Sequence, residues 1–272
     1  MDPSIERKTC TAPDGVEIVY SAAGAGDPAL VFIHGGLANR GFWDGELRRF
    51  ADRHRVLAPD LPGHGESGYR RTKWGLPEFG ADVAAVIEAE QVEKAILFGN
   101  SLGGPVAVEA ALLLPDKVLG VVGVDTFQSL SHHMGTEEAQ KRAEAFRDDY
   151  AGSVHHMVLQ LFHADADPGL LRDAERRMAK TPPEAAYAMF LSLALYRPDE
   201  SVRRLTVPLR AINGDLYPTD ITGVRNIKPD FAVKVLAHTG HYPMLERPGA
   251  FDHAVAEVAE ELTHHGVIVS GG

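Results

Sequence analysis

The 272-residue sequence has little of what several classes of protein need. It contains a single cysteine, Cys10, so an internal disulfide is excluded, and this usage is typical of a reducing compartment. No apolar run approaches the ~18 residues that a membrane span requires. The first eight residues have no apolar segment of the kind found in secretory signals. We therefore expect a cytoplasmic protein without a membrane anchor.

Positive charge is also scarce. The chain has 27 lysines and arginines against 38 aspartates and glutamates, which gives a formal net charge of −11 and a pI near 5.6. A surface with this excess of negative charge repels nucleic acid and anionic membranes. We expect neither as a partner, and a small molecule is the remaining candidate. The sequence carries no signal for an oligomeric state.

Motifs for metals and dinucleotides are missing as well. There is no H-E-x-x-H and no cysteine–histidine ligand set. Histidines occur in three adjacent pairs, but adjacent residues do not share a helix face. The glycines around residue 100 do not have the G-x-G-x-x-G spacing of a dinucleotide site. We therefore expect no metal and no cofactor; the histidine pairs are His132-His133, His155-His156 and His264-His265.

The most informative stretch joins a strand directly to a helix. Residues 94–98 are an apolar run of strand length, residues 99–103 match G-x-S-x-G around Ser101, and residues 106–114 have the composition of a buried helix. Such a junction holds the residue at the corner in strained dihedral angles, and the flanking glycines let the two elements close. The pattern favours Ser101 as a nucleophile; the alternative is an ordinary surface serine in a glycine-rich turn.

Three further motifs follow expected strands. His34-Gly35-Gly36 comes after an apolar run at 29–33, and a loop dense in turn-forming residues, with the sequence DLPGHGES, begins at Asp60. The third, with the sequence GHYP, contains His241 and follows the last expected strand at 231–237. At the N-terminus, the strand and turn signals of residues 5–33 predict a β-meander.

In order and spacing, these motifs and the Ser101 pentapeptide resemble the α/β-hydrolase fold superfamily. The resemblance runs over nearly the whole chain, apart from residues 126–205. It implies an α/β fold with a mostly parallel, doubly wound sheet. Residues 1–125 and 206–272 would form this core. Residues 126–205, whose apolar positions have helical spacing, would form an inserted helical cap.

The resemblance also implies roles for particular residues. Ser101 would attack a carbonyl carbon, and His241 would act as general base, since the chain order Ser…His matches that of the fold. Backbone N–H groups of Gly36 and Leu102 would hold the oxyanion. The alternatives are that Gly36 belongs to a plain tight turn and that His241 is a loop residue without a catalytic role. We interpret His64 as structural, because a histidine in such a loop usually holds the turn together.

The acid of the expected triad departs from the commonest pattern of the superfamily. That acid usually lies about three residues beyond a glycine that corresponds here to Gly214, and this place is taken by Tyr217. Asp215 and Asp220 are nearby, whereas Asp125 directly follows an apolar run. A carboxylate at the end of a buried strand needs a partner, and the imidazole of the base would be one. We favour Asp125 and keep Asp215 as the alternative.

The resulting hypothesis is an esterase-like or lactonase-like serine hydrolase without a cofactor that cleaves a small carbonyl ester through an acyl-enzyme. The same residues could serve a C–C bond hydrolase, an acyltransferase or a cofactor-free lyase, since this fold hosts many chemistries. A ligand-binding receptor with a vestigial triad is the alternative from another class.

Overall fold

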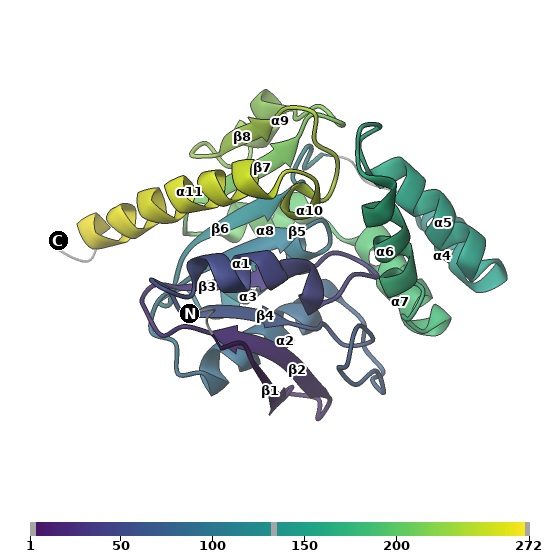
Figure 1. The fold of residues 1–272 in the computed structure, drawn as a ribbon, viewed down its shortest axis with the longest axis horizontal. Helices are drawn as coiled ribbons and strands as arrows, with labels where there is room; N and C mark the ends of the chain where they lie inside the picture. Colours follow the sequence, from purple (N-terminus) through teal and green to yellow (C-terminus); the bar gives the residue numbers. More distant parts are fainter. Residues whose placement is uncertain (1–3, 132–134, 270–272) are drawn as a thin grey trace.

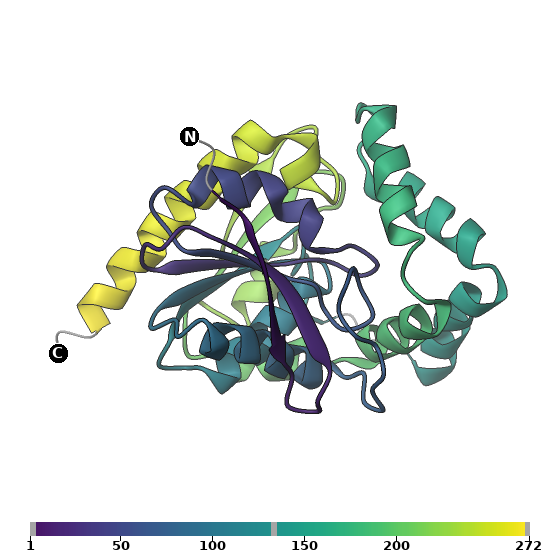
Figure 2. The same cartoon turned by 60° about the horizontal axis from the view of Figure 1, so that its bottom comes forward.

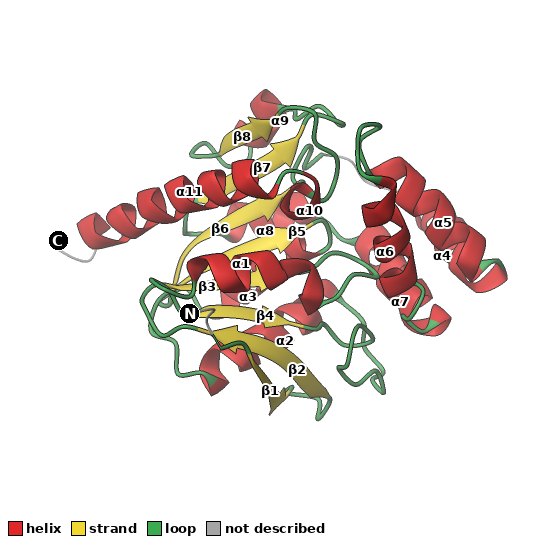
Figure 3. Cartoon of the chain, in the orientation of Figure 1, coloured by secondary structure: helices red, strands yellow, loops and turns green. Residues whose placement is uncertain are grey.

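The computed structural model describes residues 4–131 and 135–269, and its centre is a single eight-stranded sheet (Figures 1 and 3). The strand order is β1-β2-β4-β3-β5-β6-β7-β8. Strand β2 is antiparallel to both of its neighbours, and all other pairs are parallel. The strands are β1 (Glu6–Thr11), β2 (Glu17–Ala23), β3 (Ala29–Ile33), β4 (Val56–Pro59), β5 (Ala95–Asn100), β6 (Val118–Val124), β7 (Leu209–Gly214) and β8 (Ala232–Leu236). The predicted fold class, a mostly parallel α/β sheet, is confirmed.

The predicted β-meander at 5–33 is wrong in its last pairing. Strands β1 and β2 form the expected hairpin, but β3 pairs with β4 and β5 rather than with β2. The physical reason lies in burial. Every residue of β3 is buried, as expected of a strand inside a parallel sheet. The free edge of β2 is covered instead by β4.

Helices cover both faces of the sheet (Figures 1 and 2). The short η1 (Arg40–Trp43), α1 (Asp44–Phe50) and α11 (Pro248–Val269) lie on one face, and α2 (Leu76–Ala89), α3 (Gly103–Leu113) and α8 (Pro198–Arg204) on the other. Two short helices, α9 (Ile221–Arg225) and α10 (Pro243–Glu246), follow β7 and β8. Among the helices of the described residues, none is long and apolar enough to cross a membrane.

Four more helices stand beyond the carboxyl ends of the strands (Figures 1 and 2). They are α4 (Thr136–Asp148), α5 (Tyr150–Leu161), α6 (Pro168–Met178) and α7 (Pro183–Leu195). We propose these as the cap. The expected boundary at 205 includes α8, which packs on α3 of the sheet layer, because Ser201 of α8 donates from Oγ to the buried Glu109 Oε1 at 2.6 Å.

Aromatic side chains fill the core beneath the α1 face. The rings of Phe32 on β3 and Phe98 on β5 are stacked with centroids 4.9 Å apart, and Trp43 lies 5.1 Å from Phe32. All three side chains are fully or almost fully buried. Burying an aromatic side chain of this size contributes roughly 2–3 kcal/mol, so this cluster fixes the two strands whose ends carry the motifs.

Candidate active site

The backbone at Ser101 turns sharply between β5 and α3. Ser101 has a φ of 52°, which is unfavourable for a residue other than glycine. A Cβ atom on Gly99 would lie 2.0 Å from the carbonyl oxygen of Gly103, and one on Gly103 would lie 2.4 Å from that of Ile33. Both positions therefore require glycine, because the strand and the helix approach through bare backbone. Ser101 itself remains partly exposed.

The loop after β3 runs beside this corner. A Cβ atom on Gly35 would lie 3.1 Å from the Cβ of Ser101. Within residues 4–131 and 135–269, the N–H groups of Gly36 and Leu102 donate to no protein group. Two backbone donors without partners, both close to the serine, are what stabilisation of an oxyanion requires.

Two buried histidines hold this loop in place. His64 Nε2 accepts the N–H of Leu37 at 3.1 Å, and His34 Nε2 accepts the N–H of Leu61 at 2.9 Å. Burial lowers the pKa of His34 to about 4 and that of His64 to about 3. Both rings are therefore neutral near pH 7, which keeps their acceptor nitrogens available. His64 supports the loop and does not face the serine corner as a base.

The structure brings Asp125 and His241 together. His241 Nδ1 lies 2.6 Å from Asp125 Oδ2, and Asp125 Oδ1 accepts the N–H of Gly214 at 2.9 Å. Asp125 is buried, with a φ of 45° at the end of β6. This carboxylate fixes the imidazole so that Nε2 is left free to accept a proton.

The other two candidate acids are engaged elsewhere. Asp215 is more exposed and accepts the N–H groups of His238 at 2.9 Å and Thr239 at 3.0 Å. These backbone hydrogen bonds hold the pKa of Asp215 below its usual value. Asp220 accepts the N–H of Gly223 at 2.9 Å and so caps α9. Neither carboxylate contacts His241.

Two residues that the sequence motifs did not single out hold the loop of His241. Asn100 Nδ2 donates to the carbonyl of His241 at 2.9 Å and to that of Val124 at 3.0 Å. Glu246 is buried and accepts three backbone N–H groups, from Tyr242, Gly240 and His163, at 2.9–3.1 Å. The sequence feature that could have identified Glu246 is an acidic residue five positions after the candidate base His241. A carboxylate that accepts several backbone N–H groups is typical of a fixed loop.

Comparison with known proteins supports the fold. A family model described as the alpha/beta hydrolase fold matches residues 28–156. The chain has the α/β-hydrolase fold. An esterase from Thermogutta terrifontis superimposes on this chain with a TM-score of 0.82 at 22% sequence identity, over 94% of this chain and 99% of the other.

Two sequence relatives show how widely the fold is used. The 3-oxoadipate enol-lactonase 2 of Acinetobacter baylyi is 26% identical over 273 residues, 94% of this chain and 97% of the relative. The dihydrolipoyllysine-residue acetyltransferase component of the acetoin cleaving system of Cupriavidus necator is 34% identical over 136 residues. That match covers 48% of this chain, which spans just over a third, 36%, of that relative.

An apolar cavity of about 380 Å³ lies between α4 and α7 of the outer helices, α3 and the start of α8. Its walls do not include Ser101 or His241, but Phe190 connects it with the loop after β3. The Cε1 atom of Phe190 lies 3.4 Å from where a Cβ on Gly36 would be, and the ring stacks on Phe146 at 4.3 Å. The cavity is lined by Pro105, Arg142, Phe146, Phe190, Leu193, Ala194, Tyr196 and Pro198.

The histidine pairs of the sequence do not assemble into a metal site in the part of the chain that the structure describes. On α5, His155 contacts Glu175 at 3.1 Å, whereas His156 contacts Gln160 at 2.9 Å. The pair His132-His133 and the side chain of His265 lie outside the described residues. The group that does gather two histidines and a carboxylate consists of His163, Asp165 and His238.

Proposed function

We propose that this protein is a serine hydrolase that cleaves a small, uncharged or weakly polar carboxylic ester or lactone. The observation that carries the proposal is the 2.6 Å contact between His241 Nδ1 and the buried Asp125 Oδ2 next to the Ser101 corner. A buried aspartate that orients an imidazole beside a strained serine is the arrangement that activates a weak nucleophile.

The proposed reaction has two steps. His241 Nε2 takes the proton of Ser101 Oγ as this oxygen attacks the carbonyl carbon, and it then returns the proton to the departing alkoxide. In the second step His241 removes a proton from water, whose oxygen attacks the acyl carbon. The bond between this carbon and Ser101 Oγ then breaks, the acid leaves, and His241 returns the proton to Ser101 Oγ. The N–H groups of Gly36 and Leu102 would stabilise the oxyanion in both steps. Asp125 would stabilise the imidazolium, and no cofactor takes part.

The apolar cavity and the relatives support an uncharged substrate. The walls of the cavity are mainly apolar, with the aromatic rings of Phe146 and Phe190 and one cationic side chain, Arg142. An apolar pocket favours an uncharged acyl or alcohol group through the hydrophobic effect. The names of the two full-length likenesses, an enol-lactonase and an esterase, support an ester or lactone bond.

The test compares the natural protein with Ser101→Ala. Purified protein is assayed with p-nitrophenyl esters of increasing acyl length and, for lactones, by proton release at constant pH. A fluorophosphonate probe is applied in parallel. We expect labelling and turnover in the natural protein, and in Ser101→Ala no labelling and a kcat lower by roughly 10⁴ or more.

The negative outcomes separate the alternatives. Absence of labelling in the natural protein, or ordinary turnover by Ser101→Ala, would rule out the nucleophile. Labelling without turnover of any ester or lactone would contradict the proposed reaction and favour a receptor that has kept a vestigial triad. Because Ser101 is partly exposed, its replacement by alanine should leave the melting temperature unchanged, which is the control for folding.

A further inference from the structure

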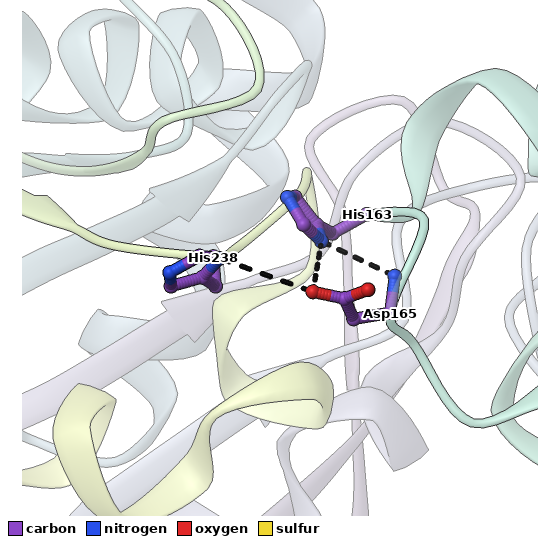
Figure 4. A group of neighbouring side chains, drawn as sticks. All are labelled: His163, Asp165 and His238. Carbon is purple, nitrogen blue, oxygen red and sulfur yellow. Dashed lines mark hydrogen bonds and ion pairs between the residues drawn. The ribbon is translucent and has the colours of Figure 1, made fainter.

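Two histidines and an aspartate meet at the surface where the outer helices approach the loop of His241. His163 and Asp165 belong to the link between α5 and α6, and His238 follows β8 (Figure 4). Asp165 Oδ2 lies 3.6 Å from His163 Nδ1 and 3.8 Å from His238 Nδ1, and one donor atom from each residue lies within 4.8 Å of the others. The two rings are nearly perpendicular, with centroids 5.7 Å apart.

We propose that His163, Asp165 and His238 bind a divalent transition-metal ion of the zinc type. Zinc is held at about 2.0–2.2 Å by imidazole nitrogen and carboxylate oxygen, so tetrahedral ligand atoms are roughly 3.4 Å apart. The observed separations reach this value through rotations of the three side chains, of which Asp165 and His238 are exposed and His163 is half-buried. Two imidazoles and one carboxylate suit zinc, cobalt or nickel, whereas magnesium and calcium prefer oxygen ligands alone.

The backbone on both sides of the site is already fixed. The N–H of His163 donates to the buried Glu246 at 2.9 Å, and the N–H of His238 donates to Asp215 at 2.9 Å. His238 also has a φ of 52°, so its backbone is held in an unfavourable conformation by its surroundings. Ligands carried on such anchored segments lose little conformational entropy when a metal binds.

One existing contact competes with the metal. The N–H of Asp165 donates to His163 Nδ1 at 3.2 Å, and metal binding at this nitrogen replaces that hydrogen bond. Asp165 is an exposed residue, so water can take the place of this hydrogen bond at a small cost. A water molecule completes the fourth coordination position, because Asp165 and His238 are exposed.

Metal binding would join the link of the outer helices to the loop that carries the proposed base. His238 is three residues before His241, and His163 is two residues after Leu161, whose carbonyl accepts the N–H of His241 at 2.7 Å. The ion would therefore act as a cross-link between cap and core, away from the reacting atoms. Because it binds the folded state, it would raise the melting temperature by roughly 5 °C at a hundredfold excess over Kd.

The test measures zinc binding to the full chain, freed of any histidine tag, by isothermal titration calorimetry. Cobalt is added in a parallel titration, where a tetrahedral site gives visible absorption. We expect one ion per chain, and a loss of about tenfold or more in affinity for both His238→Ala and Asp165→Asn. His253→Ala is the matched control, because His253 is an exposed histidine on α11 whose partner is Glu257. This variant should bind zinc like the natural protein.

Three results would overturn the proposal. The first is no stoichiometric binding of zinc or cobalt. The second is equal affinity in the natural protein, His238→Ala and Asp165→Asn. The third is binding that persists in His238→Ala but disappears in Asp125→Asn, which would place the ion at the candidate active site. The metal-free melting temperatures of all variants, measured first, show whether each is folded; the side chains of Asp165 and His238 are exposed, so we expect no change.

Discussion

The serine corner and the loop of the proposed base are built by different means. At Ser101, a strand and a helix meet within a few residues, and the geometry follows from glycines whose missing side chains admit neighbouring backbone. The loop of His241 also contains such a glycine, because a Cβ on Gly240 would lie 2.6 Å from the carbonyl oxygen of Leu161, but the backbone that it admits belongs to the distant end of α5. Its backbone is held by Asn100 at the end of β5, by the carbonyl of Leu161 and by Glu246. The corner is therefore a local structure, and the loop depends on distant parts of the fold.

The difference implies that the two regions respond differently to change. The serine corner belongs wholly to the sheet and should tolerate alterations of the outer helices. The loop of His241 shares hydrogen bonds with the end of α5 and the link to α6, so movement of those segments reaches the imidazole directly. Variants in the two regions should therefore differ in how strongly they lower kcat.

The largest effect is expected at the carboxylate that orients His241. Asp125→Asn should lower kcat by about 10³ to 10⁴, because an amide stabilises the wrong imidazole tautomer. Asp215→Asn, at an exposed turn, should cost much less. Both are measured by kcat on the ester found most active, with melting temperatures as the control. A larger loss in Asp215→Asn than in Asp125→Asn would assign the acid to Asp215.

A smaller loss is expected at the loop beside the serine corner. Gly36→Val should lower kcat on the order of 10²-fold, because the larger side chain would crowd the oxyanion at the backbone donor. This is the scale of losing one oxyanion donor. The structure adds a second cause, since a Cβ at Gly36 would lie 3.1 Å from the Cε of Met189 on α7.

A double variant separates the two causes. If Gly36→Val acts by pushing on α7, then Met189→Ala in the same chain should restore kcat. If the loss persists, the effect lies at the oxyanion donor, as the comparison of the two regions requires. A change in KM with kcat constant would show that the loop binds substrate and does not stabilise the transition state.

The loop of His241 is tested directly by Glu246→Gln. The amide keeps the shape but cannot accept three N–H groups, so His241 should lose its alignment and kcat should fall on the order of tenfold. Glu109→Gln is the matched control, because Glu109 is an equally buried acid that accepts Tyr196 Oη at 2.6 Å. Tyr196 lines the apolar cavity, so this control should change KM instead. Equal losses of kcat in both variants would contradict a specific role of Glu246.

Replacing one of the two buried histidines behind the serine corner should have the smallest effect on kcat near pH 7. It should have a clear effect on the pH dependence of stability. His34 and His64 have pKa values of about 4 and 3 when folded, against about 6.5 when unfolded. The unfolded chain therefore binds more protons between these values. The free energy of unfolding should fall as the pH drops from about 6.5 towards 4, by up to roughly 3 kcal/mol per histidine.

Urea unfolding at a series of pH values measures this slope. In His64→Gln the side chain still offers an acceptor but takes up no proton, so we expect a shallower decline with acid. An unchanged slope in this variant would show that other groups cause the acid sensitivity. Near pH 7 the kcat of His64→Gln should stay close to that of the natural protein if its oxygen replaces Nε2 at Leu37.

How much the sequence predicts follows the same division. The strand–serine–helix corner and the sheet with its helices could be predicted, because the signals lie within short runs of residues. The strands that pair with β3 could not be predicted, because the pairing of buried strands depends on which strand edges the rest of the chain leaves open. Asp125 and Asp215 could be ranked but not separated, because the decision depends on where the loop of His241 lies in space. Glu246 and the group around His163 were missed for the same reason.

The hydrogen bonds between the loop of His241 and the link after α5 have a consequence for protein engineering. The outer helices look like an exchangeable module, and grafting a different set is an obvious way to seek a new substrate range. However, the carbonyl of Leu161 and the N–H of His163 come from that module and contact His241 and Glu246. A chimaera with crossover points at 135 and 196 would replace both. Keeping residues 161–163 of the original chain, and exchanging the helices on either side separately, would preserve the position of His241 in the recombined protein.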